Sequence, residues 1–420
     1  MKSDRNWPFD RQIVSFLVCF QTFQEREPSM TDCLSPEAKE DLLSRGYSRR
    51  SLGRVAALMS AGMAVRSIVG RAEASPLTAL PAGDVTKMVR IGSNECWTGP
   101  FPAAAKAGAA TVFEGNRYDP TGHTRDDLIR TASKVDNVPE NCILPWGGSS
   151  DPLCRTIVTF CSPTRGLVTA DPSYEAGWVA SEWLKIPLVK VPLDASNGYK
   201  TDVKAMLKAN PNAGVYYICS PNNPTGTITP LEDIRWLVAN KPKDSIVLVD
   251  EAYIHFSNAP SAASLVAEGQ DVVVLRTFSK MFAMAGLRLG FSMAPPALHE
   301  KMMRYDGVNQ THMLPVPAVV CGTKSLTMTT DIDARRREMI AARAMTYEHL
   351  QKKGISFIPS DANMFVIDWK RPAGPIKDAF LKENIIIGRS WPIWPNASRI
   401  TVGSMSDMKK FCAALDRIIG

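Results

Sequence analysis

Metal and disulfide chemistry find little support in this sequence. Its nine cysteines stand at irregular spacings and include no Cys-x-x-Cys pair, so neither a zinc ribbon nor a disulfide framework is indicated. The five histidines are scattered along the chain, and none lies near another at the spacing of paired metal ligands. We therefore predict no metal site.

Long apolar runs and massed basic residues are also missing. The apolar run at residues 13–20 is too short to cross a bilayer, so we predict no stable membrane insertion. The formal net charge of +7 is spread over 420 residues, which argues against a nucleic-acid partner. The tightest basic run, residues 335–337, lies in a helical pattern at 331–350 and is expected to form a solvated helix face.

The first 75 residues differ in composition from the rest of the chain. A basic stretch at 48–54 contains the pair Arg49-Arg50 and precedes a weakly apolar stretch at 55–65. The small-x-small sequence at 72–74 then resembles a cleavage site. This order predicts an export signal, and the paired arginines resemble a twin-arginine signal, which would carry a folded enzyme to the periplasm.

The alternative is an amphipathic N-terminal helix of a cytoplasmic enzyme. Arg66 interrupts the apolar stretch, and 48 residues before the arginine pair are many for such a signal. Met30 would be a more natural start for a leader of ordinary length. The sequence leaves both interpretations open.

From about residue 85 onward, the chain alternates between strand and helix patterns. Short runs that are apolar on both faces predict buried strands at 166–170, 215–219, 246–250 and 272–276, with a helix at 230–240 between two of them. This alternation predicts an α/β fold with a mostly parallel sheet flanked by helices. Ligands of such sheets bind beyond the carboxyl ends of the strands.

Chemically useful side chains follow these strands. Lys280 lies just past the fourth strand between hydroxyl residues, and a lysine amine can form an imine with an aldehyde. Thr277, Ser279 and Arg288 provide two hydroxyls and a guanidinium that can clamp a phosphate. Taken alone, Lys280 would be an ordinary surface lysine.

A second set of side chains suits a cationic heteroaromatic ring. Asp250 ends a buried strand, and a buried carboxylate needs a cation such as a protonated pyridine nitrogen. Tyr253 and Asn223 could hydrogen-bond a ring hydroxyl. Each residue has a plain structural alternative, since Asp caps helices and Asn-Pro marks turns. Their order and strand-end placement together favour the chemical interpretation.

Three motifs carry a family resemblance: PNNPTG at 221–226, VDEAY at 249–253, and TFSK with AGLRLGF between 277 and 291. They resemble the fold-type I pyridoxal 5'-phosphate (PLP) aminotransferases of classes I and II. Within that family the chain looks most like the histidinol-phosphate aminotransferase branch. The resemblance covers roughly residues 85 to 420, and three motifs in this order are specific.

The resemblance implies roles for the residues just described. Lys280 would hold PLP as a Schiff base and shuttle a proton, Asp250 would face the pyridine nitrogen, and Asn223 and Tyr253 would reach the ring hydroxyl. The cofactor phosphate would be bound by Thr277, Ser279 and Arg288.

Further matches extend the implied cofactor site. Ser149 and Ser150 resemble a loop that opens a helix and binds phosphate, although Ser150 replaces a usual acidic residue. Tyr174 stands where the family has an aromatic residue on the cofactor ring. Tyr118, in an Arg-Tyr element, would reach the neighbouring subunit's cofactor and implies a homodimer with shared sites. The alternative for Tyr118 is plain core packing.

The implied substrate residues lie near the C-terminus. Arg399 would hold the substrate carboxylate, Asn363 would assist, and Arg389 matches a second arginine that holds phosphate in histidinol-phosphate enzymes. Trp391 and Trp394 depart from the family pattern and could shape the pocket or cover the small domain's core. Residues 92–97 also depart from the pattern, where the family has Asn-Glu-Asn-Pro.

These observations predict an aminotransferase that moves an amino group from an L-amino acid or a phosphorylated amino alcohol to a 2-oxo acid. Alternatives are another PLP reaction, such as decarboxylation or oxidation, and a non-enzymatic regulator with an aminotransferase-like domain. The expected organisation is a leader at 1–75, a segment at 76–115 that joins the small domain, a large PLP-binding domain at 116–310 and a small α+β domain at 311–420.

Overall fold

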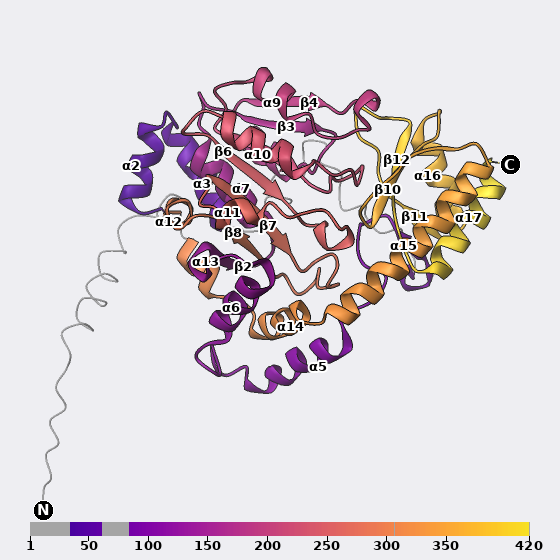
Figure 1. Ribbon diagram of the computed structural model, residues 1–420, viewed down its shortest axis with the longest axis horizontal. Helices are drawn as coiled ribbons and strands as arrows, with labels where there is room; N and C mark the ends of the chain where they lie inside the picture. The colour runs from indigo at the N-terminus through magenta and orange to yellow at the C-terminus, as the bar shows by residue number, and fades with distance from the viewer. Residues whose placement is uncertain (1–33, 61–83, 306, 420) are drawn as a thin grey trace, which may run out of the picture.

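A seven-stranded sheet forms the centre of the large domain (Figure 1). The computed structural model describes residues 34–60, 84–305 and 307–419. The strand order is β2-β8-β7-β6-β5-β3-β4, and all neighbours are parallel except β8, which runs antiparallel to both β2 and β7. The strands are β2 (Ile143–Trp146), β3 (Leu167–Asp171), β4 (Leu188–Pro192), β5 (Val215–Cys219), β6 (Ile246–Asp250), β7 (Val272–Thr277) and β8 (Gly290–Met293).

The four strands predicted from apolar runs are confirmed as β3, β5, β6 and β7, and the helix predicted at 230–240 is α10 (Leu231–Asn240). Every residue of β5, β6 and β7 is buried, as expected for strands covered on both faces. The PLP fold-type I prediction of a mostly parallel sheet flanked by helices is therefore confirmed. The other helices around this sheet are α5 (Pro102–Ala110), α6 (Thr124–Asp136), α7 (Ser150–Phe160), α8 (Ala176–Leu184), α9 (Val203–Ala209), α11 (Ala263–Ala267), α12 (Pro296–Met303), α13 (Gly307–His312) and α14 (Val316–Leu326).

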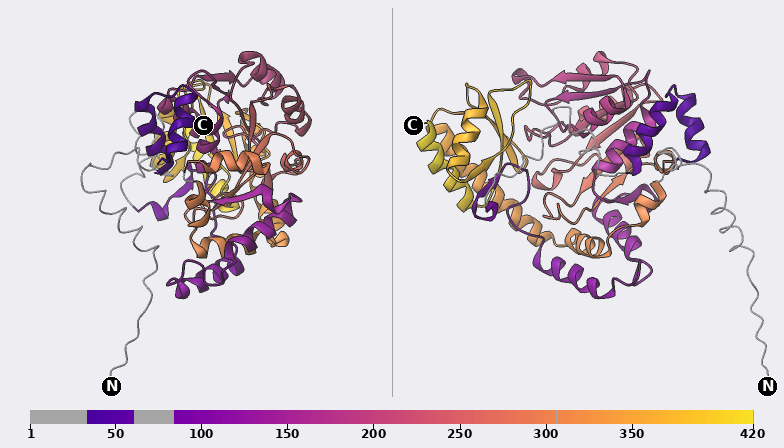
Figure 2. Two further views of the ribbon diagram at one scale, coloured as in Figure 1. Left: turned by 90° about the vertical axis from the view of Figure 1, so that its left-hand side faces the viewer. Right: turned by 180° about the vertical axis from the view of Figure 1, so that it is seen from behind.

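The C-terminal part forms a smaller α+β layer at the opposite end of the molecule from α2 (Pro36–Ser44) (Figures 1 and 2). It contains an antiparallel sheet of order β12-β10-β9 and a separate parallel pair of β1 with β11. The β1–β11 pair joins the segment before the large sheet to the C-terminal part. The elements are β1 (Val89–Ile91), β9 (Ser356–Ile358), β10 (Met364–Asp368), β11 (Ile385–Ile387), β12 (Ala397–Thr401), α15 (Thr329–Lys352), α16 (Ala373–Lys382) and α17 (Met405–Ile419).

Two helices before residue 61 pack onto the large domain. Helix α3 (Arg49–Ser60) begins with the paired arginines and contacts α7 and α8. Val55 and Ala56 on α3 are buried in the main core. The Arg54 guanidinium donates to the Trp183 carbonyl at 3.2 Å, and the Trp183 indole donates to the Arg54 carbonyl at 3.1 Å. The predicted cleavage sequence at 72–74 lies outside the described residues.

The prediction that residues 335–337 form only a solvated helix face is wrong for Arg335. Its guanidinium is buried and donates to the Met281 carbonyl at 2.7 Å and to the Gly99 carbonyl at 2.9 Å. It also lies over the Phe101 ring at 4.2 Å, so Arg335 joins α15 to two distant segments of the chain. None of the helices in the described part has the length and apolar composition needed to cross a bilayer.

Candidate active site

The two central site residues come from neighbouring parallel strands. Asp250 is the last residue of β6, and Lys280 follows the end of β7. The Lys280 Nζ donates to the Asn94 carbonyl at 2.8 Å and lies 5.6 Å from the centre of the Tyr253 ring. The sheet therefore brings the predicted amine, carboxylate and phenol to one edge.

Asp250 is a buried carboxylate whose hydrogen-bond donors are neutral. It accepts hydrogen bonds from the Tyr217 hydroxyl at 3.1 Å and from the Ala252 backbone N–H at 3.2 Å. Burial raises the pKa of Asp250 to about 6, although these hydrogen bonds and the charge of Lys280 oppose the rise. A protonated pyridine nitrogen would supply the cation that a buried carboxylate needs, so Asp250 fits a PLP ring.

A cradle for a phosphate forms where α7 begins. Gly148, with φ of +103°, precedes Ser149 and Ser150, so the first N–H groups of α7 point out of this turn. A Cβ at Gly148 would lie 2.3 Å from Nη2 of Arg288, so only glycine lets this guanidinium come so near.

Hydroxyl groups complete the cradle. The Arg288 guanidinium donates to Ser279 Oγ at 3.4 Å, and the Thr277 hydroxyl donates to Ser279 Oγ at 2.9 Å. Ser150 Oγ lies 3.3 Å from the Tyr174 hydroxyl, which connects the cradle to the aromatic residue of the site. Amides, hydroxyls and a cation therefore meet at one place, which suits the PLP phosphate.

Two hydrogen bonds fix the residues predicted to face the ring hydroxyl. The Tyr253 hydroxyl accepts from the Asn94 side-chain amide at 2.9 Å, and Asn223 Oδ1 accepts from the Arg399 guanidinium at 3.0 Å. Burial holds the pKa of Tyr253 well above its usual value, so this phenol keeps its proton at neutral pH.

Arg399 is the buried cation of the predicted substrate end. It also donates to the Gly92 carbonyl at 2.8 Å, while its buried Nε has no hydrogen-bond partner among the described residues. Burial lowers the pKa of Arg399 to about 10, so it remains charged at neutral pH. Asn363 lies buried, and within the described ranges neither atom of its side-chain amide has a partner.

Arg389 is already neutralised by a carboxylate. Its guanidinium forms an ion pair with Glu175 at the start of α8 and lies 4.4 Å from the centre of the Trp391 ring. The same ring is 6.0 Å from the Arg399 guanidinium, so Trp391 lies close to both arginines. Trp394 instead contacts Tyr199 edge-to-face at 5.4 Å and covers the small sheet. The structure thus brings Trp391, but not Trp394, to the arginines.

The comparisons with known proteins agree with this geometry. The family model described as aminotransferase class I and II matches residues 86–415. The chain belongs to that family. Its cofactor is PLP, and it is an aminotransferase.

Two relatives and one solved structure illustrate the match. The histidinol-phosphate aminotransferase of Symbiobacterium thermophilum is 30% identical over 79% of this chain and 91% of its own. The aromatic amino acid aminotransferase of Rhodococcus jostii is 28% identical over 80% of this chain and 91% of its own. The fold matches the structure of histidinol-phosphate aminotransferase from Sinorhizobium meliloti in complex with PLP, with a TM-score of 0.72 and 21% identity over 85% of this chain and 93% of that one.

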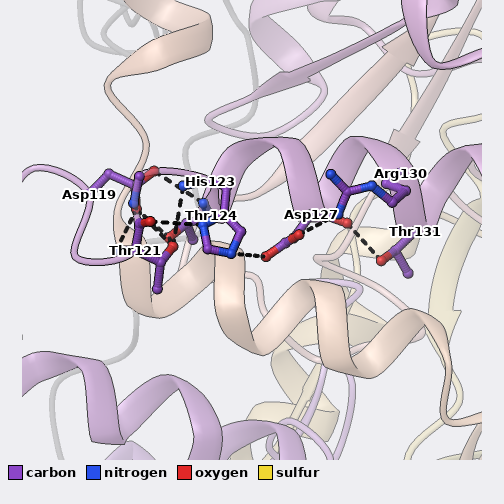
Figure 3. A network of polar contacts seen from close by, with 8 residues as sticks. Asp119, Thr121, His123, Thr124, Asp127, Arg130 and Thr131 are labelled. Atoms are coloured by element: carbon purple, nitrogen blue, oxygen red, sulfur yellow. Dashed lines mark hydrogen bonds and ion pairs between the residues drawn. The ribbon is translucent and has the colours of Figure 1, made fainter.

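Tyr118 of the aminotransferase is not a core residue within one chain, because 94% of its surface is exposed. The loop after it is held by a network of hydrogen bonds (Figure 3). The Asp119 carboxylate accepts from the Thr124 hydroxyl at 2.6 Å and from the backbone N–H groups of Thr121, Gly122 and Thr124, which span the turn before α6 and its first residue. Burial opposes ionisation of Asp119, but these hydrogen bonds lower its pKa overall. The carboxylate therefore anchors the loop that presents Tyr118.

Sequence reasoning missed two residues of the aminotransferase site. Asn94 uses its carbonyl for Lys280 and its amide for Tyr253, and it adopts a φ of +57°. Tyr217 lies within a buried strand and bonds Asp250. The unusual stretch at 92–97 was a signal for Asn94, whereas Tyr217 has the pattern of any buried strand residue. The described residues include no group of three or more His, Cys, Asp or Glu side chains arranged for a metal ion.

Proposed function

We propose that the aminotransferase acts on an L-amino acid with one α-carboxylate and a flat or long apolar side chain. The observation that carries this proposal is the pairing of Arg389 with Glu175, which leaves Arg399 as the cation for a substrate anion. The guanidinium of Arg399 would bind the carboxylate, and Asn363 would add a hydrogen bond. Trp391 would provide a flat wall for the donor side chain.

The remaining site residues have separate tasks in this proposal. Bound PLP supplies an electron sink for the charge that develops at the substrate α-carbon. Lys280 Nζ would hold the cofactor covalently, and after the donor amine displaces it, the freed amine would move the proton from the substrate α-carbon to C4' of the cofactor. Asp250 keeps the ring nitrogen cationic, and Asn223 and Tyr253 orient the ring by its hydroxyl.

The phosphate end fixes the position of the cofactor. Ser149 and Ser150 would donate through the first turn of α7, while Thr277, Ser279 and Arg288 would close the cradle. Tyr174 would cover one face of the ring. Holding the cofactor at both ends limits its tilt, so that Lys280 meets the same bond of each substrate.

A second candidate donor is a phosphorylated amino alcohol, because several relatives are named histidinol-phosphate aminotransferases. A phosphate carries nearly two charges, so its binding would need Arg389 as well as Arg399. Glu175 stands against that use, since it would have to release Arg389.

A half-reaction assay separates the two donors. Each donor is added to the holoenzyme without an oxo acid, and loss of cofactor absorbance above about 400 nm reports amino transfer. We expect phenylalanine, tyrosine or leucine to react faster than histidinol phosphate. The variant Glu175→Gln frees Arg389 and should improve the phosphorylated donor most, while Glu182→Gln on the same helix is the control. A wild-type enzyme that strongly prefers histidinol phosphate contradicts the proposal.

We also propose a homodimer in which Tyr118 serves the site of the partner subunit. The exposed position of Tyr118 and the anchored loop behind it support this assembly. Such a tyrosine would contact the cofactor phosphate across the interface.

Export of the enzyme remains a prediction. Its alternative is a cytoplasmic enzyme that keeps its N-terminal helix. The packing of α3 supports the alternative of an N-terminal helix that stays with the folded enzyme, because its apolar face is already buried against α7 and α8. Cell fractionation and the mass of the mature protein distinguish the two. A periplasmic protein that starts after residue 74 would establish export.

A further inference from the structure

We infer that the aminotransferase has a second ligand site, for a small molecule that carries a phosphate group, at the amino-terminal edge of the large sheet. The cofactor residues follow the carboxyl ends of the strands, whereas this site lies before β3 and β6. In Figures 1 and 2 the region around α2 and α12 lies at the far end of the molecule from the small domain. The proposal does not depend on the identity of the amino donor.

The site is a cavity of about 590 Å³. The ends of α2, α7 and α12 surround it, together with the residues that lead into β3 and β6. Its volume falls within the range of roughly 300–1,000 Å³ that is typical of small-molecule pockets.

The charges on the wall favour an anion. Four cationic residues line the cavity against two acidic ones, Asp41 and Asp244, which leaves a formal excess of two positive charges. Burial alone would raise the pKa of Asp41, but hydrogen bonds from Tyr305 and Arg45 lower it overall. Asp41 is therefore ionised, and Arg45 at 3.0 Å and Arg304 at 3.8 Å neutralise it.

Arg45 covers carbonyl groups whose partial negative charge would oppose anion binding. The carboxyl end of a helix carries partial negative charge, and α7 ends at this cavity. The Arg45 guanidinium donates to the Val158 carbonyl at 2.6 Å and to the Cys161 carbonyl. It thereby covers the carbonyl groups that would repel a phosphate.

Arg165 and Lys301 are the two lining cations left to bind a ligand. The Arg165 guanidinium donates to the Ala213 carbonyl at 3.4 Å and to the Ser245 hydroxyl at 3.3 Å, and neither partner is charged. Within the ranges that the structure describes, neither Arg165 nor Lys301 forms an ion pair with a carboxylate. Two cations without acidic partners match the nearly double charge of a phosphate monoester, whereas a monocarboxylate would leave one cation uncompensated.

This cavity extends beyond the part of the chain that the family model matches. Asp41 and Arg45 belong to or directly follow α2, and the family match begins at residue 86. The N-terminal segment thus supplies one wall of the site, and the ligand need not resemble the substrate.

Calorimetric titration of the full-length holoenzyme tests the proposal, with inorganic phosphate, glycerol 3-phosphate and acetate as probes. Bound PLP keeps these anions out of its own phosphate cradle. We expect both phosphates to bind, acetate to bind much more weakly, and the double variant Arg165→Gln/Lys301→Gln to weaken phosphate binding at least about tenfold, since charged hydrogen bonds are lost.

The control variant Lys409→Gln/Lys410→Gln removes the same charge from the exposed face of α17 and should bind phosphate like the wild type. Arg399→Lys should also leave phosphate binding unchanged, because Arg399 belongs to the active site. If the double variant does not fold, Lys301→Gln alone is titrated in its place. The proposal is overturned if phosphate does not bind, if acetate binds equally well, if the pocket variant binds normally, or if either control loses binding.

Discussion

Asp250 makes the protein without its cofactor sensitive to pH. Burial raises the pKa of Asp250 to about 6, above its value in the unfolded chain. The folded protein therefore binds this proton more tightly than the unfolded chain does. The stabilisation is fully present below the unfolded pKa of about 4 and is lost as the pH rises through about 6, at a cost of about 2–3 kcal/mol.

Urea unfolding of cofactor-stripped protein at pH 5 and pH 7.5 measures this effect at ~25 °C. We expect Asp250→Asn to be more stable than the wild type at pH 7.5, with a smaller difference at pH 5. Adding PLP should reverse the order, because the wild-type carboxylate then gains a cationic partner. Equal pH dependence in both proteins would show that Asp250 is not the titrating group.

The same substitution should slow the enzyme. An amide does not hold the ring nitrogen as a cation, so Asp250→Asn should bind PLP and react more slowly by roughly 3 kcal/mol in the barrier, about a hundredfold. Single-turnover rates with saturating donor measure the loss. An unchanged rate would mean that Asp250 is only structural.

Lys280 carries a prediction with a spectroscopic readout. Lys280→Ala should abolish turnover and remove the absorbance above about 400 nm, since no other amine replaces it. Lys280→Arg should behave in the same way, because a guanidinium stays protonated and forms no imine. The folded state of both variants is checked by circular dichroism. Activity like that of the wild type in either variant contradicts the assignment.

At the scale of elements, a buried ion network ties β7 to the motif that holds Asp250. The Arg276 guanidinium on β7 donates to Glu251 at 2.9 Å and to Asp136 on α6 at 2.8 Å. Burial raises the pKa of Glu251, although Arg276 opposes the rise. Removal of Arg276 would leave two buried carboxylates without a cation.

Arg276→Met should therefore lower the free energy of unfolding by about 3–5 kcal/mol. The control is Arg235→Met, which breaks an exposed pair with Glu268 and should cost under about 1 kcal/mol. Urea unfolding of both holoenzymes measures the difference. Similar losses in the two variants would show that the buried Arg276 network contributes no more to the free energy of unfolding than an exposed ion pair does.

The sequence predicts the central strands well because their residues are apolar on both faces and short runs suffice to mark them. It does not predict the β1–β11 pair, whose register of Val89 with Ile385 depends on contacts far apart in the chain. The burial of Arg335 is not predicted for the same reason. A basic residue in a helix gives the same sequence pattern whether it faces water or donates to the distant carbonyls of Met281 and Gly99.

The active-site residues show the same difference between local motifs and long-range contacts. Lys280, Asp250 and Asn223 lie in local motifs, so their neighbours in the sequence are enough to identify them. The pairing of Arg389 with Glu175 joins residues far apart in the chain, and neither flank predicts it. Asn94 reaches Lys280 and Tyr253 by the same long-range route. Residues in local motifs are thus visible in the sequence, whereas contacts between residues far apart in the chain depend on the folded structure.

For the whole molecule, the proposed assembly rests on Tyr118. Tyr118 is a large aromatic side chain that is 94% exposed on a loop anchored by Asp119, so a partner subunit can reach it. In a two-fold dimer each Tyr118 would reach the other subunit's site, so an active site would need Lys280 from one chain and Tyr118 from the other. Light scattering of the wild type should give the mass of two chains.

Mixing two impaired variants tests whether the sites are shared. Lys280→Ala and Tyr118→Phe homodimers each lack one required residue in both sites, but a hybrid dimer contains one complete site. After subunit exchange at equal concentrations, we expect about a quarter of the wild-type activity, because half of the dimers are hybrids with one intact site of two. Mass spectrometry of differently tagged chains verifies the exchange, and each variant alone must be clearly impaired. If hybrids form and activity does not rise, Tyr118 acts within its own chain or not at all, and the two active sites are independent.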